Sequence, residues 1–148
     1  MARNLKSDFK IISICPVNEY KANLEDAYYK SINWNIDRTK LLDMKGILRL
    51  RNIIKNFNSD DIVHIFTIKS LYLFIFSTLF FKKDFKVIVS ITGLGYLFAD
   101  TILAKILRNI TKPLVRVRIN SSIDYLIFQN KDNFKKFVDY SNYKNNSQ

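Results

Sequence analysis

The residues best suited to ligand chemistry stand at the ends of three apolar runs, at 61–66, 85–91 and 124–129. They offer hydroxyl groups, amides, one cation and two glycines spaced one residue apart. Such glycines let a backbone approach a ligand closely, although a plain tight turn would also explain them. The predicted substrate-binding residues are Thr67, Lys69, Thr92, Gly93, Gly95, Gln129 and Asn130.

Other kinds of chemistry find little support in the sequence. His64 is the only histidine and Cys15 the only cysteine, so we expect no metal site and no internal disulfide. Phe98 occupies the third glycine position of a GxGxxG pattern, and no Ser-His-Asp set, carboxylate pair or P-loop is present. His64 lies in the middle of an apolar run and is interpreted as a core residue. No catalytic residue is assigned.

The 148 residues carry a formal net charge of +11, and 48% are apolar. A core of ordinary size is expected, and the charge either solvates helix faces or attracts phosphate-rich partners such as nucleic acid, anionic lipid or nucleotide sugars. Aromatic residues stand mainly within apolar runs, not among lysines and arginines, which disfavours nucleic acid as a partner.

An aromatic stretch at 70–81 invites a membrane interpretation. It has about a dozen residues, whereas a spanning helix needs roughly 20, so a buried helix is expected. A peripheral membrane protein held by basic charge and this aromatic helix is a further hypothesis. No signal peptide is visible, and the single cysteine favours the cytoplasm.

Predicted strands and helices alternate along most of the chain. This order predicts an α/β, Rossmann-like fold with a parallel sheet and helices on both faces. The predicted strands are 9–15, 32–36, 61–66, 85–91 and 124–129. The predicted helices are 21–30, one opened by Asp43, 70–81, one starting near Asp100 and a short one capped by Asn130.

Several details of these elements can be tested against a structure. Pro113 predicts an interruption of the helix that starts near Asp100, and 115–119 alternates as a strand would. Residues 141–148 are polar and are expected to fray. The residues expected to face the core are Met44, Ile47, Leu48, Ile54 and Phe57 of one helix and Phe134, Phe137 and Val138 of the last.

Three segments in order resemble motifs of one family. DIVHIFTIK at 61–69 is similar to "DIVHxxTxK", SITGLGYLF at 90–98 to "xxTGLGYxF", and DYLIFQNKD at 124–132 to "DxxIFQNPDD", with Lys131 where proline is usual. Over residues 9–139, the chain resembles the N-terminal, acceptor-side domain of a family-4 glycosyltransferase of the capsule or exopolysaccharide type, which has the GT-B fold.

The resemblance implies two Rossmann-like domains and sugar transfer with retention in the cleft between them. The implied partners are a glycan or lipid-linked acceptor, a separate donor-binding subunit and an anionic membrane surface at the inner face of the cell membrane. No cofactor is implied, and a nucleotide sugar would be the donor substrate only together with a C-terminal domain. A basic non-enzymatic module for nucleic acid or membrane is the alternative.

Two departures from the family pattern shape our expectations. Residues 9–15 align best with the family's second strand, so the first strand is expected to be missing beside 61–66. No counterpart of the donor-binding domain follows. We therefore expect a truncated enzyme that is inactive alone, with 1–140 as a partial GT-B domain and 141–148 as a tail.

Overall fold

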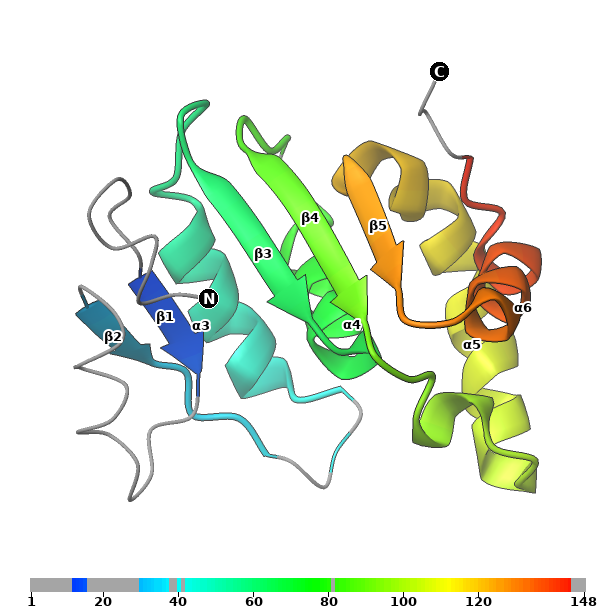
Figure 1. Ribbon diagram of the computed structural model, residues 1–148. Helices are drawn as coiled ribbons and strands as arrows, with labels where there is room; N and C mark the ends of the chain where they lie inside the picture. The colour runs from blue at the N-terminus through cyan, green and yellow to red at the C-terminus, as the bar shows by residue number, and fades with distance from the viewer. Residues whose placement is uncertain (1–11, 16–29, 38–39, 41, 81, 145–148) are drawn as a thin grey trace. The chain divides into compact units, whose positions relative to one another are not determined.

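The computed structural model describes residues 12–15, 30–37, 40, 42–80 and 82–144. Its strands form two sheets, and the strands within each sheet are parallel. Helices alternate with the strands along the chain (Figure 1), which confirms the predicted α/β, Rossmann-like fold. The strands are β1 (Ile12–Cys15) and β2 (Lys30–Asn33) in one sheet, and β3 (Ile62–Phe66), β4 (Lys86–Ile91) and β5 (Tyr125–Phe128), in that order, in the other. The helices are α3 (Met44–Ile54), α4 (Ile68–Ser77), the 3-10 helix η1 (Tyr96–Phe98), α5 (Ile102–Ser122) and α6 (Lys131–Ser141).

The chain divides into two compact units, Met1–Arg49 and Leu50–Gln148. In the first unit, the Trp34 indole N–H donates to the carbonyl of Gly46 at 2.9 Å. A Cβ on Gly46 would lie 2.8 Å from Cγ2 of Ile36, so only glycine fits there. Asp43 accepts hydrogen bonds from the amides of Asp37 and Lys45 and opens α3, as predicted. Residues 9–11 and 21–29 of the predicted elements lie outside the described residues.

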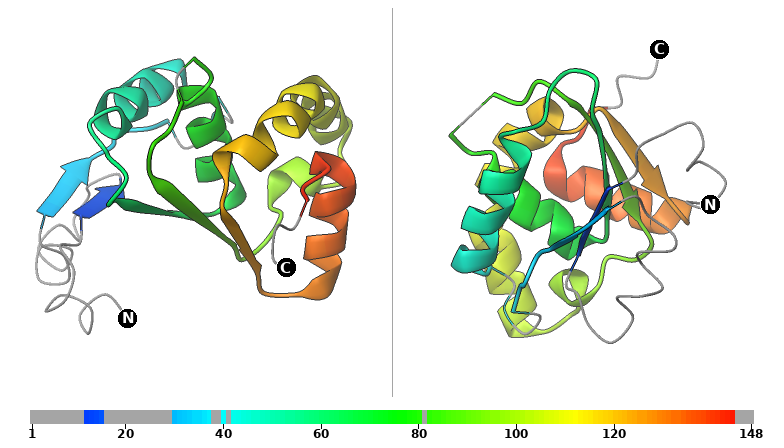
Figure 2. Two further views of the ribbon diagram at one scale, coloured as in Figure 1. Left: turned by 90° about the horizontal axis from the view of Figure 1, so that it is seen from above. Right: turned by 90° about the vertical axis from the view of Figure 1, so that its left-hand side faces the viewer.

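The second unit has its helices α4 and α5 on one face of the β3–β4–β5 sheet (Figure 2). Helix α4 forms the centre of the core, because five consecutive residues, Leu71 to Ile75, are buried. The prediction of a buried helix is confirmed for residues 70–77 of the aromatic stretch, whereas residues 78–80 form a turn and residue 81 lies outside the described part. The side chains from Leu71 to Ile75 are therefore used in packing, whereas Phe80, after the end of the helix, is exposed. Among the described residues, no helix combines the length and apolarity needed to cross a membrane.

The opposite face of this sheet leaves apolar side chains exposed. Ile62 and Phe66 of β3 are exposed, as are Tyr125 and Ile127 of β5. The nearly all-apolar sequence of β3 is thus not explained by burial on both sides. His64 shares this face and is also exposed, so its interpretation as a core residue is wrong. The strand alternation turns residues 62, 64 and 66 away from the side that α4 covers.

A buried polar network joins helices α4, α5 and α6 of the second unit. The hydroxyl of Tyr72 in α4 donates to the hydroxyl of Tyr140 in α6 at 2.7 Å. The Tyr140 hydroxyl also lies 2.8 Å from Oγ1 of Thr111 in α5. Burial, together with the neighbouring Tyr140, raises the pKa of Tyr72 well above its ordinary value. These hydroxyls are satisfied by one another, as buried polar groups must be.

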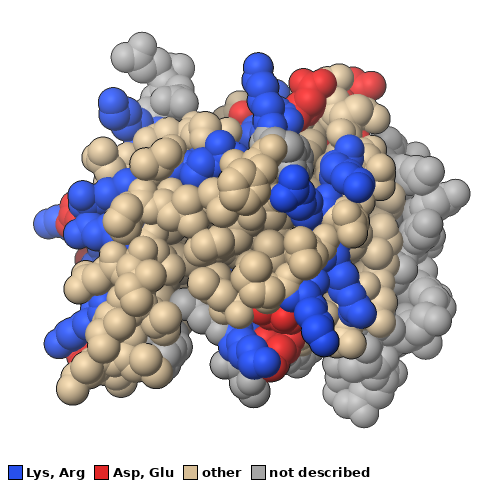
Figure 3. Space-filling model, turned by 180° about the vertical axis from the view of Figure 1, so that it is seen from behind, with Lys and Arg blue, Asp and Glu red and all other residues tan. Residues whose placement is uncertain are grey.

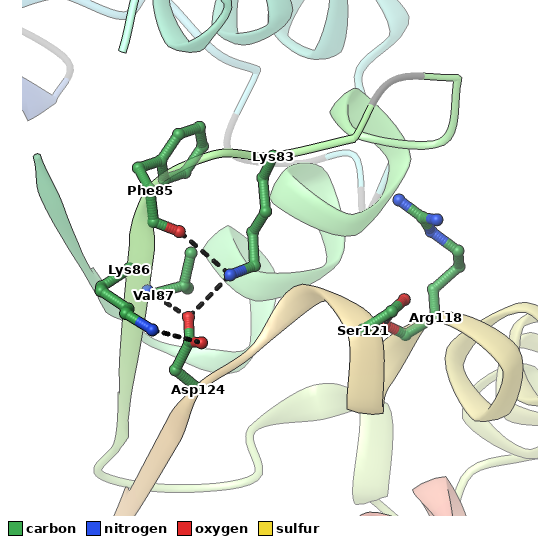
Figure 4. A network of polar contacts seen from close by, with 7 residues as sticks. All are labelled: Lys83, Phe85, Lys86, Val87, Arg118, Ser121 and Asp124. Carbon is green, nitrogen blue, oxygen red and sulfur yellow. Dashed lines mark hydrogen bonds and ion pairs between the residues drawn. The ribbon is translucent and has the colours of Figure 1, made fainter. Parts of the chain in front are cut away.

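Asp124 fastens the start of β5 to β4 (Figure 4). Its Oδ2 accepts hydrogen bonds from Nζ of Lys83 at 2.7 Å and from the amide of Val87 at 2.8 Å. Nζ of Lys86 lies 3.8 Å from Oδ1. In return, the amide of Asp124 donates to the carbonyl of Val87 at 3.0 Å. The side chain therefore fixes the register of the two strands at the edge where they begin.

The helix after η1 differs from its prediction. Helix α5 runs without interruption from Ile102 to Ser122, with Pro113 inside it, so the predicted break and the strand-like 115–119 are wrong. Its N-cap is Thr101, whose side chain accepts from the amide of Ala104 at 3.2 Å. Tertiary contacts outweigh the local cost of proline because Thr111, Val115 and Ile119 are all buried on one side of the helix.

Smaller differences concern single residues. Met44 and Leu48, expected in the core, are exposed, whereas Ile47, Leu50 and Ile54 of the same helix are buried. Lys30 belongs to strand β2 instead of a helix. Ser141 and Tyr143 are buried, so the chain stays packed where fraying was expected, and residues 145–148 lie outside the described part.

Candidate functional site

Strands β3, β4 and β5 end level with one another. Phe66 of β3 lies opposite Ser90 of β4, and Ile91 of β4 lies opposite Phe128 of β5. The segments that start at Thr67, Thr92 and Gln129 therefore leave the sheet at a single edge. In parallel sheets this carboxyl edge is where ligands gather.

Thr67 holds an unusual backbone conformation at this edge. Its φ of 76° and ψ of 151° lie in a region that is normally populated by glycine alone. For a β-branched residue such values are strained, at a cost of about 1–3 kcal/mol. Two contacts hold it there, because its amide donates to the carbonyl of Ser90 at 3.2 Å and its side chain caps α4 at the amide of Ser70.

The two glycines of the loop after β4 have different roles. Gly95 has a φ of +57°, and a Cβ there would lie 3.8 Å from Cγ2 of Ile68, the first residue of α4. The loop thus passes close to the start of α4, next to Thr67. Apart from the two residues next to it in the chain, no described residue has a heavy atom within 4 Å of the position of a Cβ on Gly93, so a side chain there would extend into open space.

Arg108 of α5 holds the far end of this loop. Its Nη1 donates to the carbonyls of Leu97 at 2.6 Å and Ala99 at 3.1 Å. The guanidinium group also lies over the ring of Phe98, 5.6 Å from its centroid. These contacts fix η1, which follows directly on the glycine segment, so Arg108 is a positioning residue for the loop.

The remaining predicted residues also lie at the carboxyl edge. Thr92 and Gln129 are exposed, and Lys69 is half-buried in the first turn of α4. Asn130 caps α6, because its Oδ1 accepts from the amide of Asn133 at 2.8 Å, as predicted. The edge therefore presents two threonine hydroxyls, an amide side chain, a lysine and a glycine loop.

His64 and Ser90 form a pair that sequence reasoning missed. Nε2 of His64 lies 2.8 Å from Oγ of Ser90, and its ring packs on Phe66 with 4.2 Å between centroids. Partial burial lowers the pKa of His64 below its ordinary value, so the imidazole is mainly neutral at pH 7. The signal was available in principle, because residues 64 and 66 alternate onto one face with Ser90, next to the glycine loop.

Within the described part of the chain, no three histidine, cysteine or carboxylate side chains are grouped so that they could hold a metal ion. Among these residues, the edge instead offers neutral hydrogen-bonding groups and the lysines Lys69 and Lys131. Such groups bind sugar hydroxyls and phosphates by hydrogen bonding and charge, without covalent chemistry.

A family model described as "Glycosyl transferase 4-like" matches residues 1–130 of the chain. The chain belongs to this family. The match includes strands β1 to β5 and every residue of the carboxyl edge from Thr67 to Asn130. No curated protein matches the sequence. The resemblance to a family-4 glycosyltransferase is thereby confirmed at the level of the family. The capsule type, the missing first strand and the role of each edge residue in this glycosyl transferase 4-like domain stay predictions.

Proposed function

We propose that this chain is the acceptor-binding side of a glycosyltransferase that moves a sugar from a nucleotide sugar to a glycan acceptor, itself lipid-linked. The match to the glycosyl transferase 4-like family over residues 1–130 carries this proposal. The arrangement of the carboxyl edge supports it. Open space at Gly93 leaves room for a ligand, and the strained Thr67 is the kind of backbone outlier that clusters at functional sites.

In this proposal the edge receives the acceptor. Thr67, Thr92 and Gln129 would hydrogen-bond sugar hydroxyls, and Lys69 would offset negative charge nearby. Gly93 and Gly95 would let the backbone approach the acceptor closely. Asn130 would take part in acceptor binding from the segment that follows β5, where its side chain also caps α6.

Donor binding is assigned to residues outside these 148, in a C-terminal domain or a separate subunit. Retaining transfer depends on electrostatic stabilisation of the departing nucleotide, and in this proposal the donor-binding part supplies it. We propose no cofactor and no metal for the reaction, and a location at the cytoplasmic face of the membrane, where a lipid-linked acceptor would be.

The test is a transfer assay with a panel of nucleotide sugars and a membrane lipid extract as acceptor. We expect no transfer by the 148-residue chain alone and measurable transfer when a donor-binding domain of the family is supplied. Turnover by the chain alone would contradict the assignment of donor binding to other residues. Failure of every complemented pair would contradict the proposed function.

Replacement of Gly93 by valine tests the role of the carboxyl edge in transfer separately from the stability of the fold. Because a Cβ at this position meets open space, we expect the variant to unfold at the same urea concentration as the parent chain. Transfer by the complemented pair should fall, about tenfold or more, because the side chain would occupy the space proposed for the acceptor. Ser59→Val, in the exposed turn at the opposite edge of the same sheet, is the control and should leave transfer unchanged. Equal rates in both variants would remove the loop from the site.

A further inference from the structure

Helix α5 carries a ridge of exposed apolar side chains along its outer side. Their exposed fractions lie between 49% and 79%, although the residues are aliphatic. The spacing follows the helical repeat and places all five side chains on one side of the helix, with the exposed Pro113 between Ile110 and Val117. The ridge consists of Ile102, Leu103, Ile106, Ile110 and Val117.

The ridge lies directly opposite the buried side of the helix. Ala104, Thr111, Val115 and Ile119 face the core, about half a turn away from the ridge. From Ile102 to Val117 the ridge is about 22 Å long, at 1.5 Å per residue. It is therefore a long apolar surface on a helix whose other side packs against the core.

The charges of α5 are all of one sign. Its 21 residues contain five lysines and arginines and no aspartate or glutamate. Lys105, Lys112 and Arg116 follow one another along one flank of the ridge. Lysine and arginine side chains also gather on the helix-bearing side of the molecule in Figure 3, where acidic side chains are few.

The arginines of α5 additionally anchor the helix. Arg116 donates to the carbonyls of Tyr140 and Asp139 near the end of α6, at 3.0 and 3.3 Å. Arg118 donates to the carbonyl of Thr78 at 2.6 Å, at the end of α4. With Arg108 on the glycine loop, each arginine ties α5 to another segment. The ridge is thus displayed on a helix that cannot turn without breaking these bonds.

We propose that the α5 ridge is a docking surface for an anionic lipid bilayer. Aliphatic side chains flanked by cations are the pattern of a helix that lies in the plane of the membrane interface. The ridge would enter the boundary between headgroups and acyl chains, while Lys105 and Lys112 meet lipid phosphates. The inference deepens the proposed function, because a docked ridge would place the carboxyl edge near a lipid-linked acceptor. In this respect it rests on the proposed function.

Two other occupants fit the ridge less well. A second copy of this chain would bring together two surfaces of a molecule with a net charge of +11, and no carboxylate of α5 would offset the repulsion. Nucleic acid would satisfy the cations, but the aliphatic side chains provide no aromatic platform on which bases could stack. A bilayer with acidic headgroups would contact both the apolar side chains of the ridge and the cations on its flank.

The experiment is vesicle flotation of the full chain with two lipid compositions, phosphatidylcholine alone and phosphatidylcholine mixed with phosphatidylglycerol. Neither contains a glycan or a nucleotide sugar, so the result does not depend on whether the chain takes part in transfer. We expect binding to the anionic vesicles only, weakening as NaCl screens the charges. Binding to both compositions alike would overturn the proposal, as would binding to neither.

Substitutions then locate the surface. Ile106→Ser with Ile110→Ser should lower the partition coefficient about tenfold or more, because two apolar side chains no longer enter the interface. The matched control, Tyr125→Ser with Ile127→Ser, removes two exposed apolar side chains from the open sheet face and should bind as the parent does. Lys105→Glu with Lys112→Glu should lower binding and its dependence on salt. Circular dichroism confirms that each variant is folded.

A second readout places the ridge within the bilayer. Ile110→Trp should show a blue shift of tryptophan emission on addition of anionic vesicles, whereas Ile127→Trp should not. An equal loss of binding in the ridge and sheet-face variants would overturn the assignment. So would concentration-dependent self-association in light scattering that the ridge variant abolishes, because the occupant would then be a second copy.

Discussion

Thr67 and Gly95 show how single residues shape the candidate site. Both have positive φ, and both lie at the start of α4, where Thr67 is the N-cap and Gly95 faces Ile68. Glycine adopts such a conformation at no steric cost, whereas threonine is strained. Thr67 is retained there with its side chain bonded to Ser70, so the strain serves to direct the chain from β3 sharply into α4.

Asp124 leads to a prediction about pH. Partial burial raises the pKa of this carboxyl, but the Lys83 hydrogen bond, the Val87 amide and the charges of both lysines outweigh it and set the net pKa below its ordinary value. A depressed folded-state pKa stabilises the protein above the unfolded pKa, about 3.9, and this contribution is lost as pH falls through the folded value.

Asp124→Asn should therefore lower the free energy of unfolding by about 1–3 kcal/mol at neutral pH, because a charged hydrogen-bond acceptor is lost. The gap between parent and variant should close as the pH falls below about 4. Urea denaturation across this range measures both quantities. A gap that widens in acid would show that the carboxylate is not the group that fastens β5 to β4.

At the scale of elements, α5 organises the second unit through its arginines. Arg108→Met keeps much of the side chain's length but removes the donors to Leu97 and Ala99. We expect faster amide hydrogen exchange in residues 93–100 and little change in α4, since local opening reflects local contacts. Arg116→Met is the matched control, because its bonds lie at the end of α6. Faster exchange at α6 in both variants would mean that Arg108 has no specific hold on the loop.

The elements show what could be predicted from the sequence. Strands β3, β4 and β5 can be recognised in the sequence as apolar runs rich in β-branched residues. Helix α4 can be recognised as an aromatic run with charged residues on both sides. The carboxyl edge follows from the rule that parallel strands end together. The full length of helix α5 could not be predicted from the sequence. Pro113 and the alternation after it are local signals against a helix, whereas the helix is stabilised by tertiary contacts of the buried Thr111, Val115 and Ile119.

The site was foreseen less completely than the elements. The residue types that follow the strands could be named, but the strain at Thr67 and the contact of Gly95 with Ile68 depend on how two loops meet in space. The exposure of His64 depends on which sheet face the helices cover. An apolar run around a histidine has the same sequence on either face, so its burial could not be deduced.

At the scale of the whole molecule, charge acts against the fold. A net charge of +11 on 148 residues produces self-repulsion that favours expansion. The repulsion is concentrated on α5, where Lys112 stands one turn from both Arg108 and Arg116 and no carboxylate intervenes. If the ridge binds an anionic surface, the cations on its flank strengthen that binding and lower the stability of the free protein.

Salt should therefore stabilise the free chain. Between about 0.1 M and about 1 M NaCl, the screening length falls from about 10 Å to about 3 Å, so we expect the melting temperature to rise. Lys112→Glu separates repulsion from salting-out, because the introduced carboxylate would stand between two arginines, in the middle of the helix and away from the ends of its dipole. This variant should melt higher than the parent at low salt and gain less from added NaCl, while it binds anionic vesicles more weakly. If parent and variant gain equally from NaCl, charge repulsion on α5 is not what salt relieves, and the opposition between stability and membrane binding would be refuted.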